Sequence, residues 1–125
     1  MRDDIVVGVL GATGALGSEI LKQLNKVSWH PSRIVPYASA GTTVQFVEYG
    51  EEQIAVEDSR YLDMGSLDLL VVAAPLAVAK PVVAEAVRYG LAVVDCSGSL
   101  GNDTGWLVPW INPESLEKSV DMRLV

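Results

Sequence analysis

Apolar and polar residues follow one another in blocks that predict buried strands and amphipathic helices. Residues 5–10 are apolar and mostly β-branched, which is typical of a parallel strand covered on both faces. Glycines follow at once, and the next segment carries apolar residues at helical spacing with polar residues between them. This stripe consists of Leu16, Ile20, Leu21, Leu24 and Val27. The chain therefore begins with a strand, a glycine turn and a helix.

The same alternation continues along the chain. A second helix is expected at residues 78–89, ended by Gly90, and Pro36 indicates an edge or irregular position in the strand that contains it. Alternating strands and helices predict one α/β domain, with a Rossmann-like, doubly wound, mostly parallel sheet and helices on both faces. The other expected elements are strands at 33–38, 67–74, 91–95 and 122–125, a hairpin at 44–47 and 53–56, and a short helix at 114–118.

The glycine turn is the strongest candidate for a binding site. Gly11, Gly14 and Gly17 stand three residues apart between strand and helix, where missing side chains let the backbone turn tightly and an anion approach. The first amide groups of the helix would point at that anion, and a pyrophosphate is the natural ligand. The alternative is a turn that only packs strand against helix. The residues expected at the pyrophosphate are Gly11, Thr13, Gly14, Ala15 and Leu16.

Composition narrows the class of protein. A net charge of -7 among 125 residues argues against nucleic acid as a partner, and no segment offers about 20 uninterrupted apolar residues for a membrane. Cys96 is the single cysteine, so no disulfide framework is expected, and a cytoplasmic location is predicted. His30 is interpreted as a surface residue, and the acidic residues between 48 and 58 are interpreted as solvated strand ends.

Four motifs, in order, resemble the N-terminal coenzyme domain of aspartate-semialdehyde dehydrogenases. They are VLGATGALG at 9–17, ASAG at 38–41, VVDCSGSL at 93–100 and LVPWINPESL at 107–116. The resemblance implies NADP-dependent interconversion of an acyl phosphate and an aldehyde through a cysteine thioester. A second domain would supply the dimer interface and the catalytic cysteine, which is expected beyond residue 125. We therefore expect residues 1–125 to form a single NAD(P)-binding domain without catalytic residues, and Cys96 to be a small residue at the site.

The resemblance also assigns the other cofactor contacts. Ser39 is expected at the ribose, and Ala74 and Ser97 are expected near the nicotinamide end. Family members usually carry arginine and lysine around the ASAG stretch to hold the 2′-phosphate, but residues 39–43 offer only hydroxyls and backbone. No acidic residue ends the second strand, so the sequence does not choose NAD instead. The cofactor can thus be NADP or NAD, and the sequence leaves this choice open.

There are two alternatives to the enzyme's coenzyme domain, and the first rests on further departures from the family's sequence pattern. The serine-rich loop after residue 96 has no arginine to bind a substrate phosphate, and Ala74-Pro75 replaces a glycine pair of the family. These changes are similar to those of a non-catalytic paralogue that acts as an interaction or dimerisation module. The other alternative is a coenzyme domain like that of N-acetyl-glutamyl-phosphate reductase. The expectation for this chain is nicotinamide dinucleotide binding, no turnover, and a possible homodimer.

Overall fold

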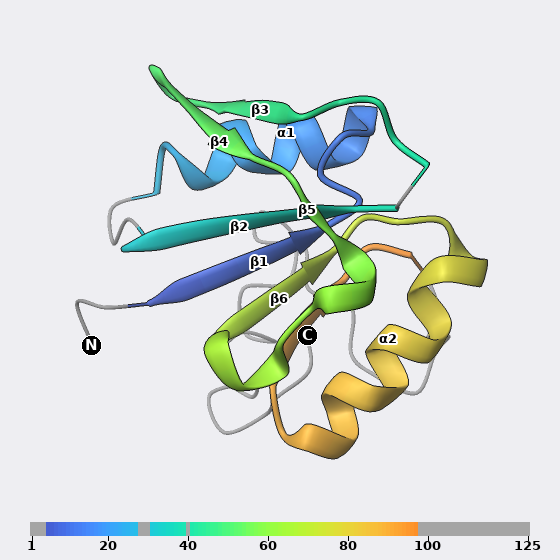
Figure 1. Cartoon of the computed structure of the whole chain (residues 1–125). Coiled ribbons are helices and arrows are strands. Elements are labelled where there is room, and N and C mark those ends of the chain that lie inside the picture. The colour runs from blue at the N-terminus through green and yellow to red at the C-terminus, as the bar shows by residue number, and fades with distance from the viewer. Residues whose placement is uncertain (1–4, 28–30, 40, 98–125) are drawn as a thin grey trace, which may run out of the picture.

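A computed structural model describes residues 5–27, 31–39 and 41–97, so the expected helix at 114–118 and strand at 122–125 lie outside it. Its centre is a parallel five-stranded sheet with the order β5-β2-β1-β6-β7 (Figure 1). This order places the first strand in the middle of the sheet, as in a doubly wound fold. The strands are β1 Val6–Leu10, β2 Arg33–Ala38, β5 Glu57–Asp58, β6 Leu69–Val72 and β7 Ala92–Asp95.

Successive residues of the central strands point to opposite faces of the sheet, and each face has its own core. In β1, Val7 and Val9 belong to one core, and Leu10 belongs to the other. All three are almost fully buried, as expected for a strand covered on both faces. The apolar block at residues 5–10 thus fills two cores at once.

Helix α1 (Ala15–Leu24) covers one face together with an antiparallel hairpin of β3 (Phe46–Tyr49) and β4 (Glu52–Ala55) (Figure 1). The hydroxyl of Tyr49 donates to the carbonyl of Leu24 at 3.4 Å, which links the hairpin to the end of α1. Leu21 and Leu24 are buried as the helical stripe predicts. Leu16 is 47% exposed, so its expected place in the stripe is wrong: it lies in the first turn, beyond the edge of the core.

Helix α2 (Leu76–Tyr89) covers the other face (Figure 1). Ala79, Val83 and Ala86 recur at helical spacing and are buried against the sheet. Gly90 ends the helix in the left-handed conformation, with φ 88°, and its amide donates to the carbonyls of Ala86 and Val87. The predicted stop at Gly90 is therefore confirmed.

Pro36 lies at a local edge of the sheet, as predicted, whereas β5 was not predicted. β2 is an inner strand, yet β5 pairs only with Tyr37 and Ala38 at its end. Pro36 therefore sits where β5 does not reach, which explains how an inner strand contains a residue without an amide hydrogen. β5 itself, and the short 3₁₀ helices Ser59–Tyr61 and Met64–Ser66 after it, fall in a segment that has no clear apolar period.

Candidate functional site

The glycine turn joins β1 to α1 and is fixed by backbone hydrogen bonds. The amides of Gly11 and Ala12 both donate to the carbonyl of Tyr37 in β2, at 2.9 and 3.2 Å. Gly14 then donates to the carbonyl of Gly11 at 3.2 Å, closing a tight turn before the helix. The turn is thus anchored to the neighbouring strand and positioned at the carboxyl edge of the sheet.

The three glycines have different surroundings. Gly11 has φ +83°, and an added Cβ would lie 2.7 Å from the amide nitrogen of Ala74. At Gly17 an added Cβ would lie 2.1 Å from the carbonyl oxygen of Gly11, so helix and turn are in direct backbone contact there. At Gly14 the nearest atom of the described residues would be the same oxygen, at 3.7 Å. Gly11 and Gly17 are required by the protein itself, whereas Gly14 leaves open space towards solvent.

Open space at Gly14 coincides with the positive end of the helix dipole. Gly14 is the extended N-cap of α1 and makes no side-chain cap, and the first helical turn carries no acidic side chain. Gly14, Ala15 and Leu16 are exposed. The first-turn amides belong to Ala15, Leu16 and Gly17, slightly later than the expected residues 13–16. This arrangement can accept an anion such as a pyrophosphate.

The carboxyl ends of four strands meet around this turn, as the doubly wound fold predicts. The amide of Ala73 donates to the carbonyl of Leu10, and that of Cys96 donates to Val72, each at 2.8 Å. Ala74 is buried beneath Gly11. Ser97 is half-buried and donates both its amide and its hydroxyl hydrogen to the carboxylate of Asp95. Residues 40, 98 and 99, which follow β2 and β7 in the sequence, lie outside the described part of the chain.

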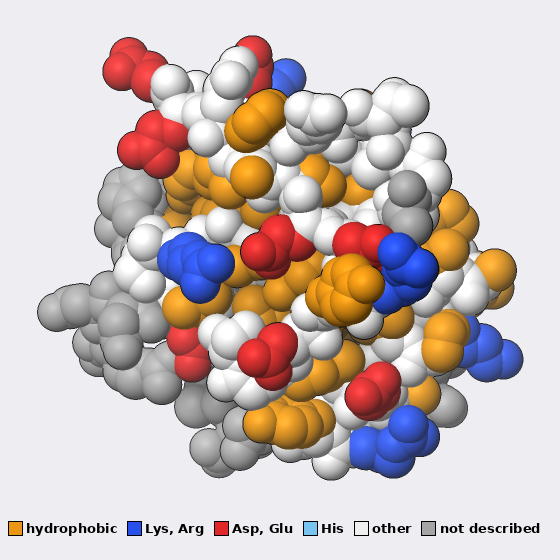
Figure 2. Space-filling view, in the orientation of Figure 1, with side chains coloured by type: hydrophobic (Ala, Val, Ile, Leu, Met, Phe, Trp, Pro, Cys, Tyr) orange, Lys and Arg blue, Asp and Glu red, His pale blue; other side chains and the backbone are white. Residues whose placement is uncertain are grey.

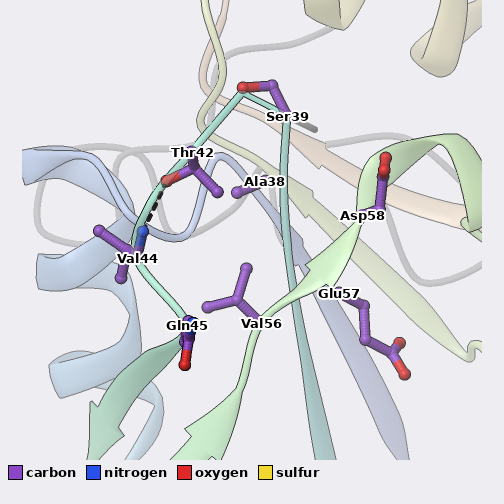
Figure 3. Close-up of a pocket in the computed structure, with 8 residues that line it drawn as sticks. All are labelled: Ala38, Ser39, Thr42, Val44, Gln45, Val56, Glu57 and Asp58. Carbon is purple, nitrogen blue, oxygen red and sulfur yellow. Dashed lines mark hydrogen bonds between the residues drawn. The ribbon is translucent and has the colours of Figure 1, made fainter.

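A pocket of about 240 Å³ lies beside the carboxyl end of β2 (Figure 3). Ser39 is on its wall, as expected for a residue near a ribose, and Asp58 approaches from the neighbouring strand. Asp58 pairs in register with Ala38, the last residue of β2. Asp58 is the last residue of β5, as expected for a solvated strand end, and the pairing of β5 with β2 brings it to this edge. The lining residues are Ala38, Ser39, Thr42, Val44, Gln45, Val56, Glu57 and Asp58.

Asp58 is held in place by Arg60. Its carboxylate accepts hydrogen bonds from the Arg60 amide at 2.9 Å and from Nε and Nη2 at 3.0 and 2.8 Å. These hydrogen bonds lower the pKa of Asp58 below its ordinary value, so the group is a carboxylate at neutral pH. An ionised acidic group thus lies beside the carboxyl end of β2, on the adjacent strand β5.

Cys96 follows the end of β7 and differs from a reactive thiol. Partial burial and the neighbouring Asp95 carboxylate raise the pKa of its thiol above its ordinary value. A nucleophilic cysteine requires the opposite shift. The raised pKa of Cys96 is consistent with its expected role as a small residue at the site.

The described residues contain no group of three or more histidine, cysteine and acidic side chains that could hold a metal ion. No helix in this part of the chain has the length and apolar character needed to cross a membrane. Basic and acidic side chains are interspersed on the face seen in Figure 2.

The parallel sheet with a central first strand and the glycine turn at its carboxyl edge define the fold as Rossmann-like. The chain belongs to the family described as "Semialdehyde dehydrogenase, NAD binding domain", whose model matches residues 6–119. The resemblance stated from the four motifs is thereby confirmed, and so is the prediction of a dinucleotide-binding domain.

Similar proteins carry two different names. An aspartate-semialdehyde dehydrogenase from Legionella pneumophila is 32% identical over 95 residues, which are 76% of this chain and 27% of that protein. A USG-1 protein homolog from Pseudomonas aeruginosa is 30% identical over 100 residues, covering 80% of this chain and 30% of that protein. The solved structure of a probable aspartate-semialdehyde dehydrogenase from P. aeruginosa superposes with a TM-score of 0.82 at 28% identity, covering 91% of this chain and 34% of that one. The chain thus spans about a third of the length of such relatives.

Proposed function

We propose that this chain binds a nicotinamide dinucleotide across the carboxyl edge of its sheet. The pyrophosphate lies on the first turn of α1, against Gly11, Thr13, Gly14, Ala15 and Leu16. Ser39 contacts the adenosine ribose, and Ala74 and Ser97 lie towards the nicotinamide end. The observation that carries the proposal is the contrast among the three glycines of the turn: a side chain at Gly11 or Gly17 would clash with backbone atoms of the described residues, whereas one at Gly14 would not. A ligand that approaches the backbone closely explains it.

We extend the proposal to the activity of the longer protein to which this domain would contribute. Residues 1–125 act as a single NAD(P)-binding domain in an oxidoreductase that interconverts an acyl phosphate and an aldehyde, as the family resemblance implies, and the Legionella relative bears the name aspartate-semialdehyde dehydrogenase. Catalytic residues and the contacts of a homodimer come from outside these residues. The raised pKa of Cys96 supports this assignment, since a protonated thiol is a poor nucleophile. Binding without turnover is therefore expected of this chain, in the cytoplasm.

A second candidate is a dinucleotide-binding module that performs no catalysis, acting through protein interaction. The similarity to a USG-1 protein homolog favours this second candidate, because the name of that relative states no enzymatic activity. The reductase-like alternative has no separate observation in its favour.

The test is a fluorescence titration of the purified chain with NADH and with NADPH, repeated on Gly14→Val. We expect saturable binding of at least one cofactor and its loss in the variant, because a side chain at Gly14 would occupy the space left for the pyrophosphate. Urea unfolding of both proteins is the control, since the structure leaves room for a Cβ at this position. No binding of either cofactor at millimolar concentration would refute the proposal.

A further inference from the structure

We infer that Asp58 makes the ribose end of this site select NAD(H) and exclude NADP(H). The inference rests on the proposed dinucleotide function and concerns which of the two cofactors is bound. The two differ by a single phosphate on the 2′ oxygen of the adenosine ribose. A residue that faces this oxygen therefore decides between them.

The position of Asp58 is set by the pairing of two parallel strands. In doubly wound folds that bind NAD, an acidic residue at the end of the second strand accepts a hydrogen bond from the ribose 2′ hydroxyl. Here β2 ends in Ala38 and is followed by Ser39, neither of which is acidic. Asp58 lies next to Ala38 in β5, and both line the pocket at this edge. The acidic group is thus supplied by the adjacent strand instead of by β2.

The side chains at this edge point in different directions. Figure 3 shows the Asp58 carboxyl group directed towards the Ser39 side of the pocket, whereas the Glu57 carboxyl group points away from Ser39. The Asp58 side chain is 21% exposed, so a ligand can reach it. A ribose near Ser39 would therefore meet one carboxylate, that of Asp58.

Charge determines the preference. An ionised carboxylate accepts a hydrogen bond from a 2′ hydroxyl but repels a 2′-phosphate, and no lysine or arginine is among the residues that line the described pocket. The carboxylate has room for about four hydrogen bonds, and Arg60 makes three. One acceptor position is therefore left for the ribose.

Arg60 is the group that could reverse this preference, since a guanidinium can hold a 2′-phosphate. In this structure Nε and Nη2 of Arg60 are both engaged by Asp58, and its guanidinium carbon lies 5.6 Å from the centre of the Tyr61 ring. Arg60 is thus oriented on Asp58 and outside the pocket lining. Its role is to position and ionise the carboxylate.

The experiment compares dissociation constants for NADH and NADPH, which share the same nicotinamide fluorophore, at one ionic strength. For the parent chain we expect NADPH to bind at least about tenfold more weakly than NADH, because like charges would be brought together. In Asp58→Asn the ratio should fall to about threefold or less, since the amide still accepts a hydrogen bond but carries no charge. The amide also retains the bond from the Arg60 backbone, so the fold is preserved.

Two variants serve as controls. Glu57→Gln removes the same charge one residue away, on the side that points away from Ser39, and should leave the ratio within about twofold of the parent value. Arg60→Gln should leave the affinity for NADPH within about twofold of the parent value, whereas a larger fall in NADPH affinity with NADH affinity unchanged would make Arg60 a phosphate ligand and overturn the inference.

Failure of this inference differs from failure of the proposed function. Equal or tighter binding of NADPH by the parent chain, lost in Gly14→Val, would refute the selection by Asp58 and leave dinucleotide binding in place. Absence of binding by both cofactors would refute the two proposals together.

Discussion

The sharpest structural prediction concerns the three glycines of the turn, each replaced by alanine. At Gly17 the new methyl group would lie 2.1 Å from the carbonyl oxygen of Gly11 and 2.8 Å from Cα of Ala12. Both neighbours are backbone atoms, so relief requires a shift of α1 against β1. Overpacking of this kind costs about 1–3 kcal/mol or more, and the gain in helix propensity returns about 1 kcal/mol. We expect Gly17→Ala to lower the free energy of unfolding by about 2 kcal/mol.

Gly11→Ala should lower the free energy of unfolding by more than Gly17→Ala does, and Gly14→Ala should lower it by less. Gly11→Ala adds a left-handed backbone cost of about 1–2 kcal/mol to a contact of 2.7 Å with Ala74, so the loss should exceed that of Gly17→Ala. Gly14 has φ -81° and ψ 174°, which alanine adopts freely. Its N-cap cost of about 0.5–1 kcal/mol is offset by a similar entropy loss in the unfolded chain, leaving a change within about 0.5 kcal/mol of zero.

Equilibrium urea unfolding followed by circular dichroism at 222 nm measures the free energy of unfolding of the three variants. Comparison of their m-values checks that their unfolded states are equivalent. The expected order of stability loss is Gly11→Ala, then Gly17→Ala, then Gly14→Ala near zero. The reasoning is refuted if Gly17→Ala unfolds within about 0.5 kcal/mol of the parent, or if Gly14→Ala costs as much as Gly17→Ala.

Two further predictions concern positions outside the turn. Gly90 has φ 88°, and no described atom lies within 4 Å of an added Cβ. Gly90→Ala should therefore lower the free energy of unfolding by about 1 kcal/mol through backbone conformation alone, and Gly90→Asn should lower it by less. Equal losses for the two variants in urea unfolding would contradict this. The pH profile for alkylation of Cys96 by iodoacetamide should lie at higher pH than that of a free cysteine, because a raised pKa leaves less thiolate at any given pH. Asp95→Asn should move this profile to lower pH, and an unchanged profile would exclude Asp95 as a cause.

Local sequence determined the elements that carry the candidate pyrophosphate site. The β-branched block at residues 5–10, the three glycines and the helical stripe each act within a few residues, so period and turn chemistry suffice to predict β1, the turn and α1. The strand expected at 33–38 coincides with β2, and Gly90 ends α2 as expected. The fold class follows because strands and helices alternate.

Only the tertiary structure decided which residues share the carboxyl edge. Asp58 stands beside Ala38 because β5 pairs with β2, and no local pattern in the segment around Asp58 encodes that register. Leu16 fits the helical period but lies beyond the core, and Pro36 is tolerated inside the sheet because β5 stops short of it. The different demands on Gly11, Gly14 and Gly17 also depend on neighbours brought together by the fold. Periodicity is a property of adjacent residues, whereas a binding site is assembled from strand ends that are distant in sequence.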